Sequence, residues 1–130
     1  MWVWDAEFKV YAKGEYAIDW FIEQFVVTRM DDHKIYKINN IEYYKYDNGG
    51  QHWLMNGILR RDDGPAVICA DGKQYWYKDG VYHRDDGPAI INVNGYKAYY
   101  QDGKRHRLNG PAVEYSDDTV EYWENGVWIK

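Results

Sequence analysis

Apolar and aromatic residues alternate with polar residues in short runs over the last two thirds of the chain, and Asp-Gly or Asn-Gly pairs separate the runs. Ala66–Ala70 and Lys73–Lys78 predict two strands joined by a turn at Asp71-Gly72. Val81–Arg84 predicts a third short strand after Asp79-Gly80. Two-residue loops of this composition favour type I′ hairpins, because both central residues take positive φ. The pattern therefore predicts an antiparallel meander.

Tight turns also predict which residues lie opposite each other. The first turn of this segment sets Val67 opposite Trp76, and the second sets Tyr77 opposite Tyr82. One face of the sheet is then expected to carry Val67 with Trp76, and the other Tyr77 with Tyr82, because successive strand residues point to opposite faces.

The whole segment recurs every 23 residues, as the Gly-Pro-Ala triplets that begin at Gly64, Gly87 and Gly110 show. A fixed period of this length predicts a stack of structural repeats. Ile35–Asn48 aligns as a degenerate unit, and the last unit stops at Lys130, in the position that arginine holds in earlier units. Terminal repeats are often irregular because they close an open stack.

The first part of the chain differs in kind. Trp2–Ala12 is compatible with a strand, and Glu15–Val27 has apolar residues at helical spacing, which predicts an amphipathic helix lying on a sheet face. A hairpin turning at Lys13-Gly14 is the alternative. We predict a single mainly β domain, 1–130, with an antiparallel hairpin-repeat sheet of 23-residue units over 33–130 and a small cap of strand and helix over 1–32.

Composition adds further limits. The 130 residues include 14 Tyr and 7 Trp but only 3 Phe, which suits surfaces that are half buried and half wet. A single cysteine, Cys69, excludes an intrachain disulfide and fits a reducing compartment. No apolar run approaches the roughly 20 residues of a membrane span, and the start lacks the pattern of a signal peptide. We therefore expect a cytoplasmic protein. The net charge of −5 argues against nonspecific nucleic-acid binding.

Basic residues recur at the ends of the repeats and form what we call the basic ladder. Its members are Arg60, Arg61, His83, Arg84, Lys104, Arg105, His106 and Arg107. Such a ladder can bind phosphates or an acidic partner. Alternatively, each arginine holds the acidic turn beside it, and this role is favoured for Arg61 and Arg84. In the third copy Leu108 and Asn109 replace the two aspartates, so Arg107 is expected to lose its local partners and both roles stay open for it.

Other chemistry-bearing residues indicate no reaction. Two histidines without a third ligand are a weak zinc signal, and the paired aspartates stand in turn positions that favour Asp in any case. No nucleophile–base pattern or phosphate-binding glycine loop occurs. We expect no enzyme, no metal and no cofactor.

Two aromatic rows run along the predicted sheet. The first consists of Trp53, Trp76, Tyr99 and Tyr122, and the second, on the opposite face, of Tyr77, Tyr100 and Trp123. A sheet one layer thick cannot bury both. If the N-terminal helix covers one row, the other is exposed and suited to anchor a partner. Alternatively, the sheet curls so that both rows pack, or the protein dimerises through one.

The period, the aromatic strand centres and the turn at Tyr99–His106 resemble the MORN repeat, over roughly Ile35–Lys130. Arg84 and Arg107 stand where MORN repeats have the glycine after histidine. The HRxDGPA variant is similar to repeats in uncharacterised phage, giant-virus and bacterial proteins. MORN proteins are mostly non-enzymatic scaffolds that bind partner proteins, dimerise or contact lipid head groups, so the resemblance implies a binding module.

The sequence therefore predicts a non-enzymatic protein-binding module that docks a partner through an aromatic sheet face, with a phage-encoded or viral inhibitor of a host defence protein as the expected type. Nucleic-acid or phosphate binding through the basic ladder and a dimerising scaffold are the alternatives. The expected partner-binding residues are Trp53, Trp76, Tyr99, Tyr122, Tyr77, Tyr100, Trp123, Arg84, Arg105 and Arg107.

Overall fold

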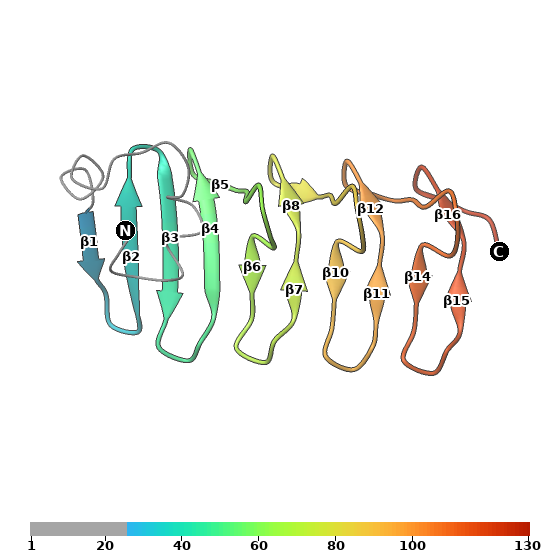
Figure 1. Ribbon diagram of the computed structural model, residues 1–130, viewed down its shortest axis with the longest axis horizontal. Coiled ribbons are helices and arrows are strands. Elements are labelled where there is room, and N and C mark those ends of the chain that lie inside the picture. Colours follow the sequence, from blue (N-terminus) through green and yellow to red (C-terminus); the bar gives the residue numbers. More distant parts are fainter. Residues whose placement is uncertain (1–25) are drawn as a thin grey trace.

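A single antiparallel sheet runs the length of the computed structural model, which describes residues 26–130 (Figure 1). Its strand order is β1-β2-β3-β4-β6-β7-β10-β11-β14-β15, with β5 paired to β4. The described residues form strands and turns and no helix, so the predicted antiparallel hairpin meander is confirmed. The strands of this sheet are β1 (Val26–Arg29), β2 (His33–Ile38), β3 (Ile41–Tyr46), β4 (Gln51–Met55), β5 (Ile58–Leu59), β6 (Val67–Ile68), β7 (Gln74–Tyr75), β10 (Ile90–Ile91), β11 (Lys97–Ala98), β14 (Val113–Glu114) and β15 (Val120–Glu121).

The N-terminal strands are the longest and hold one of the two buried clusters. Tyr36 pairs with Tyr43 across β2 and β3, and Tyr43 pairs with Trp53 across β3 and β4. Their rings touch in series, with centroids 5.5 and 4.8 Å apart. Together with Ile38 these three side chains form a core in which none is more than 8% exposed.

The predicted helix over Glu15–Val27 is wrong at its last two residues. Val26 and Val27 lie in β1 and pair with Lys37 and Tyr36 of β2. β-branched side chains favour a half-buried strand, and an available edge on β2 outweighs the helical spacing of the apolar residues. The rest of this helix, the strand predicted over Trp2–Ala12 and the turn at Lys13-Gly14 lie outside the described residues.

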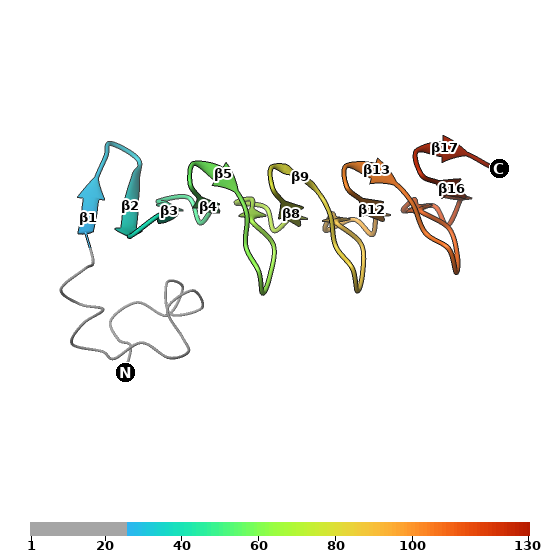
Figure 2. The same ribbon diagram turned by 90° about the horizontal axis from the view of Figure 1, so that it is seen from above.

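Each 23-residue repeat contributes two strands to the sheet and one hairpin that leaves it. The hairpins are β8 (Tyr77–Lys78) with β9 (Val81–Tyr82), β12 (Tyr100–Gln101) with β13 (Lys104–Arg105), and β16 (Trp123–Glu124) with β17 (Val127–Trp128). Figure 2 shows that these hairpins rise on one side of the sheet, while the loops that carry the Gly-Pro-Ala segments project on the other. The strand predicted over Lys73–Lys78 is therefore split at Trp76. Tyr77 does pair with Tyr82, as predicted.

The turn at Asp71-Gly72 differs from the one predicted. Val67 pairs with Tyr75 rather than with Trp76, so the predicted register is wrong by one residue. At Asp79-Gly80 both residues have positive φ, 51° and 82°, whereas at the earlier turn only Gly72 does. The Cys69 N–H donates to the Lys73 carbonyl, so three residues rather than two form the loop, with a bulge at the glycine. Val67 consequently shares a face with Tyr75 and not with Trp76.

Adjacent repeats are joined by contacts that recur in each copy. The Trp76 N–H donates to the Ala89 carbonyl of the next repeat at 2.7 Å, and Tyr99 bonds to Ala112 in the same way. Both alanines are fully buried. Pro88 lies two residues before β10. The Gly-Pro-Ala segment therefore closes one repeat onto the next.

Candidate functional site

The first aromatic row is covered by cations of the repeat itself. The four pairs are Arg61 over Trp53 at 3.9 Å, Arg84 over Trp76 at 3.9 Å, Arg107 over Tyr99 at 4.0 Å and Lys130 over Tyr122 at 4.9 Å, each measured to the ring centroid. A planar guanidinium stacks well on an aromatic face, where the ring quadrupole attracts the charge. This row and its cations form what we call the capped face. Its rings are therefore not free to anchor a partner.

Each capping arginine is held between its ring and its own loop. The Arg84 Nε donates to Asp86 Oδ1 at 3.0 Å, and its Nη1 donates to the Pro88 carbonyl at 3.2 Å. Gly87 lies against the guanidinium so closely that a Cβ there would be 2.9 Å from Arg84 Cζ. Arg61 makes the equivalent bonds to Asp63 and Pro65. The structural role predicted for Arg61 and Arg84 is thus confirmed.

Arg107 keeps the capping position with different partners. Its Nη1 donates to the Pro111 carbonyl at 3.0 Å and to Glu114 Oε2 at 3.1 Å. Arg107 thus lacks the local aspartate partners of the earlier repeats, as predicted, and Glu114 of β14 supplies its carboxylate instead. No described residue accepts a hydrogen bond from its Nε, because Asn109 stands where Asp86 stands in the preceding repeat.

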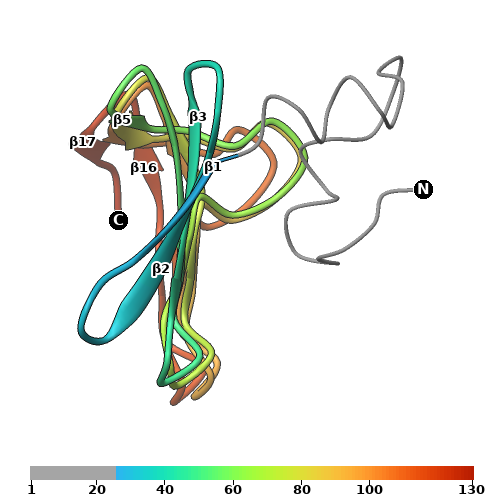
Figure 3. The same ribbon diagram turned by 90° about the vertical axis from the view of Figure 1, so that its left-hand side faces the viewer.

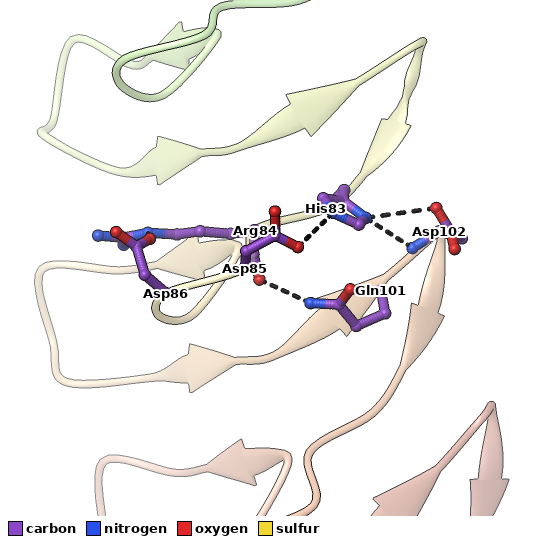
Figure 4. Close-up of polar contacts among 6 residues, drawn as sticks. All are labelled: His83, Arg84, Asp85, Asp86, Gln101 and Asp102. Carbon is purple, nitrogen blue, oxygen red and sulfur yellow. Dashed lines mark hydrogen bonds and ion pairs between the residues drawn. The ribbon is translucent and has the colours of Figure 1, made fainter.

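The histidines of the basic ladder link one repeat to the next hairpin. The Asp102 N–H donates to His83 Nδ1 at 3.0 Å, so the ring proton lies on Nε2, which donates to Asp85 Oδ1 at 2.8 Å (Figure 4). Beside it, the Gln101 side chain donates to the Arg84 carbonyl at 2.9 Å. His106 Nδ1 accepts from the Asn125 N–H in the same way at 2.9 Å. These histidines act as connections between repeats.

The second aromatic row lies with other tyrosines that the sequence did not single out. Tyr82 is central, with ring centroids 4.8 Å from Tyr77, 5.1 Å from Tyr100 and 6.0 Å from Tyr75. We call the tyrosine face the set Tyr75, Tyr77, Tyr82, Tyr96, Tyr100, Arg105, Tyr115 and Trp123. Each of its members is half-buried. Within residues 26–130 no second layer lies over the sheet (Figure 3).

Burial raises the pKa of several tyrosine hydroxyls of this face. Burial, and then the neighbouring Tyr82, raises the pKa of Tyr77 far above its ordinary value. Burial likewise raises the pKa of Tyr75 and of Tyr96. These phenols are therefore neutral donors near neutral pH.

Arg105 belongs to the tyrosine face and not to the line of capping arginines with which the sequence grouped it. Its Nε donates to the Tyr100 hydroxyl at 3.3 Å, its Nη1 lies 3.8 Å from Glu121 Oε1, and its Cζ lies 4.8 Å from the Trp123 ring centroid. The structure therefore divides the basic ladder between the two sides of the sheet.

Two clefts open between successive loops on the capped side. The first has a volume of about 580 Å³ and lies between residues 60–64 and 83–86, with Trp76 and Lys78 on its wall. The second, of about 560 Å³, lies between residues 84–87 and 106–109, with Tyr99 and Gln101 on its wall. Both are lined by acidic and basic groups together.

Metal binding, thiol chemistry and membrane insertion find little support in residues 26–130. Residues 26–130 contain no group of three or more His, Cys, Asp or Glu side chains placed to hold a metal ion. Burial raises the pKa of the free Cys69 thiol, which lowers its reactivity. Within the same residues, no helix has the length and apolar character needed to cross a membrane.

No protein-family model matches this chain, and neither a curated protein nor a solved structure matches it significantly. The resemblance to MORN repeats therefore stays a prediction from the residues alone.

Proposed function

We propose that this chain is a non-enzymatic protein-binding module that docks a partner protein through the tyrosine face. The expected contacts of Trp53, Trp76, Tyr99, Tyr122, Arg84 and Arg107 move to a supporting role in this proposal, because these residues hold the capped face together. Tyr77, Tyr100, Trp123 and Arg105 remain as contacts. Tyr75, Tyr82, Tyr96 and Tyr115 join them.

The observation that supports this proposal is that the residue types at equivalent positions vary differently between repeats on the two faces. On the capped face, the same ring-and-cation pair recurs in every unit. On the tyrosine face, the position of Tyr82 is taken by Arg105 and Trp128 in the next two repeats, and the position of Tyr75 by Ala98 and Glu121. The repeat keeps an aromatic ring and a cation at each of these positions of the capped face, but it tolerates unlike residues at these positions of the tyrosine face. Positions whose residue type is not fixed by the repeat can be occupied by residues that contact a partner protein.

The chemistry of the tyrosine face suits a protein partner. Tyrosine, tryptophan and arginine are enriched at the centres of protein interfaces, since rigid rings bury much area at little entropic cost. The neutral hydroxyls supply donors, and the Arg105–Glu121 pair supplies one charge of each sign. We place the module in the cytoplasm, where the free thiol of Cys69 stays reduced.

The alternative partners find less support. Each capping arginine already holds a backbone carbonyl and a carboxylate, and the net charge of −5 repels a polyanion. A phage-encoded inhibitor of a host defence protein, the type expected from the resemblance, stays a prediction.

Capture from host lysate with the full chain, followed by calorimetry on the purified partner, tests the proposal. Tyr77→Ala combined with Tyr100→Ala is expected to weaken binding by at least about tenfold, as loss of a central aromatic pair does. The matched control is Tyr122→Ala, which removes a half-buried ring of the capped face and leaves the tyrosine face intact. Equal affinity of the wild type and the double variant would contradict the proposal. Tight oligonucleotide binding with a steep salt dependence would contradict it too.

A further inference from the structure

The second cleft differs from the first by the loss of two internal carboxylates. In the middle repeat, Asp85 accepts from His83 Nε2 and Asp86 accepts from Arg84 Nε. In the following repeat these two positions hold Leu108 and Asn109. The donors themselves are kept, as His106 and Arg107, and both line the second cleft.

These two donors are oriented but have no acceptor among the described residues. His106 Nδ1 already accepts from the Asn125 N–H, which places its proton on Nε2. Arg107 is fixed by stacking on Tyr99 and by the bonds of its Nη1, which leaves Nε unused. The cleft thus presents two donors in the arrangement that the preceding repeat fills with carboxylates.

We propose that the second cleft binds an acidic segment of a protein partner, whose carboxylates take the places that Asp85 and Asp86 hold in the middle repeat. The middle repeat shows the acceptors that fit these donors, two aspartate carboxylates: Asp85 lies 2.8 Å from His83 Nε2, and Asp86 lies 3.0 Å from Arg84 Nε. Leu108, which is 73% exposed, stands at the mouth of the site and contacts an apolar side chain next to the acidic residues.

The surrounding charge favours a carboxylate over a phosphate chain. Asp85 and Asp86 form the opposite wall, and their side chains are 81% and 86% exposed. Two carboxylates need only one donor each, whereas a polynucleotide brings a longer line of charges past these aspartates. The second cleft shares no lining residue with the tyrosine face, so this proposal can fail while the proposed function stands.

The test is an NMR titration of the full chain with acetyl-Gly-Asp-Asp-Gly-amide, monitored at the Arg107 Nε–H and the His106 ring. We expect saturable shifts at both groups, and affinity at least about tenfold weaker for the matched Asn-Asn peptide, which lacks the charge. Absence of shifts at Arg107 and His106, or equal binding of the two peptides, would overturn the proposal. Tighter binding of an oligothymidylate at the same two groups would overturn it in favour of phosphate recognition.

Two variants make the test independent of folding. Leu108→Asp with Asn109→Asp restores the sequence of the other repeats, so it should fold as they do and abolish peptide binding by supplying the carboxylates internally. Asp85→Leu with Asp86→Asn makes the reverse change and is expected to create a second peptide site, seen as new shifts at Arg84 Nε–H. Unchanged peptide binding by the first variant, or no new site in the second, would overturn the proposal.

Discussion

Replacing Gly87 by alanine tests the closure of the repeat at a point where the backbone lies against the capping arginine. The new methyl group would lie 2.9 Å from Arg84 Cζ and 3.1 Å from its Nε and Nη1 atoms. Gly87 does not have a left-handed φ, so its backbone accepts alanine without strain. The substitution therefore acts by displacing the guanidinium from the space between Gly87 and Trp76.

The cost follows from the contacts that Arg84 gives up. Its stacking on Trp76 contributes about 1–2 kcal/mol at a partly desolvated site, and its bond to the Pro88 carbonyl about 1 kcal/mol. The pair with the highly exposed Asp86 adds little. Gly87→Ala should therefore lower the free energy of unfolding by about 2–3 kcal/mol.

Urea unfolding of a double-mutant cycle measures this interaction. Arg84→Ala alone should cost a similar amount, and adding Gly87→Ala to it should gain about 0.4–1 kcal/mol, because alanine restricts the unfolded chain and no longer meets a side chain. Gly110→Ala is the matched comparison and should cost less, since its methyl group would lie 3.1 Å from Arg107 Cζ. If Gly87→Ala lowers the free energy of unfolding by the same amount in the wild type and in the Arg84→Ala variant, the reasoning is refuted.

Three further predictions concern backbone strain and titration. Asp118→Gly should raise the free energy of unfolding by about 0.5–1 kcal/mol in urea, because Asp118 has a φ of 71° in a bulge-turn position that suits glycine; a loss of stability would contradict this. Stability should fall as pH rises above about 10, because burial raises the pKa of Tyr77 and Tyr96 only in the folded chain, which then holds more protons than the unfolded one. Ultraviolet titration checks this, and identical curves for the folded and the urea-unfolded chain would refute it. Burial, and then the charge of His33, lowers the pKa of His52 in the folded chain. The stability that the neutral imidazole contributes is therefore present above about pH 6.5 and is lost as pH falls. The His52→Gln variant should lose less stability on acidification than the wild type, and equal acid sensitivity of the two would contradict this.

The repeat and its hairpins could be predicted because they follow from local chemistry. Asn or Asp before glycine marks the turns that the periodicity required, except the one at Asp117-Asp118, and the pairing of Tyr77 with Tyr82 followed from it. The off-by-one register at the other turn could not be predicted, because Asp serves two purposes. Asp79 tolerates a left-handed φ of 51°, whereas Asp71 accepts the Lys73 N–H through its side chain at 3.1 Å. Both turns read as Asp-Gly in the sequence.

The placement of the basic residues on two different sides of the sheet could not be predicted from the sequence either. Arg105 and Arg107 are two positions apart and would share a face of a regular strand, yet they lie on different sides of the sheet. β13 ends at Arg105, and the chain then leaves the hairpin for the loop that carries Arg107. Tyr75, Tyr82, Tyr96 and Tyr115 were not predicted as partner-binding residues because they do not recur every 23 residues. Tyrosines that break the 23-residue period were the feature of the sequence that could have identified this face.

The bond from Trp76 to Ala89 and the same bond from Tyr99 to Ala112 have a consequence for insertions and deletions. Removing the 23 residues from Trp76 to Ala98 would leave the ring-and-cation pairs of the capped face and the bonds between repeats with partners of the same kind. Removing one residue fewer would send each following side chain to the opposite face. The molecule can therefore lengthen or shorten only by whole units, each worth two strands or about 9.6 Å of sheet. Every unit gained brings one more capped ring and a fresh set of unconstrained positions for selection to act on.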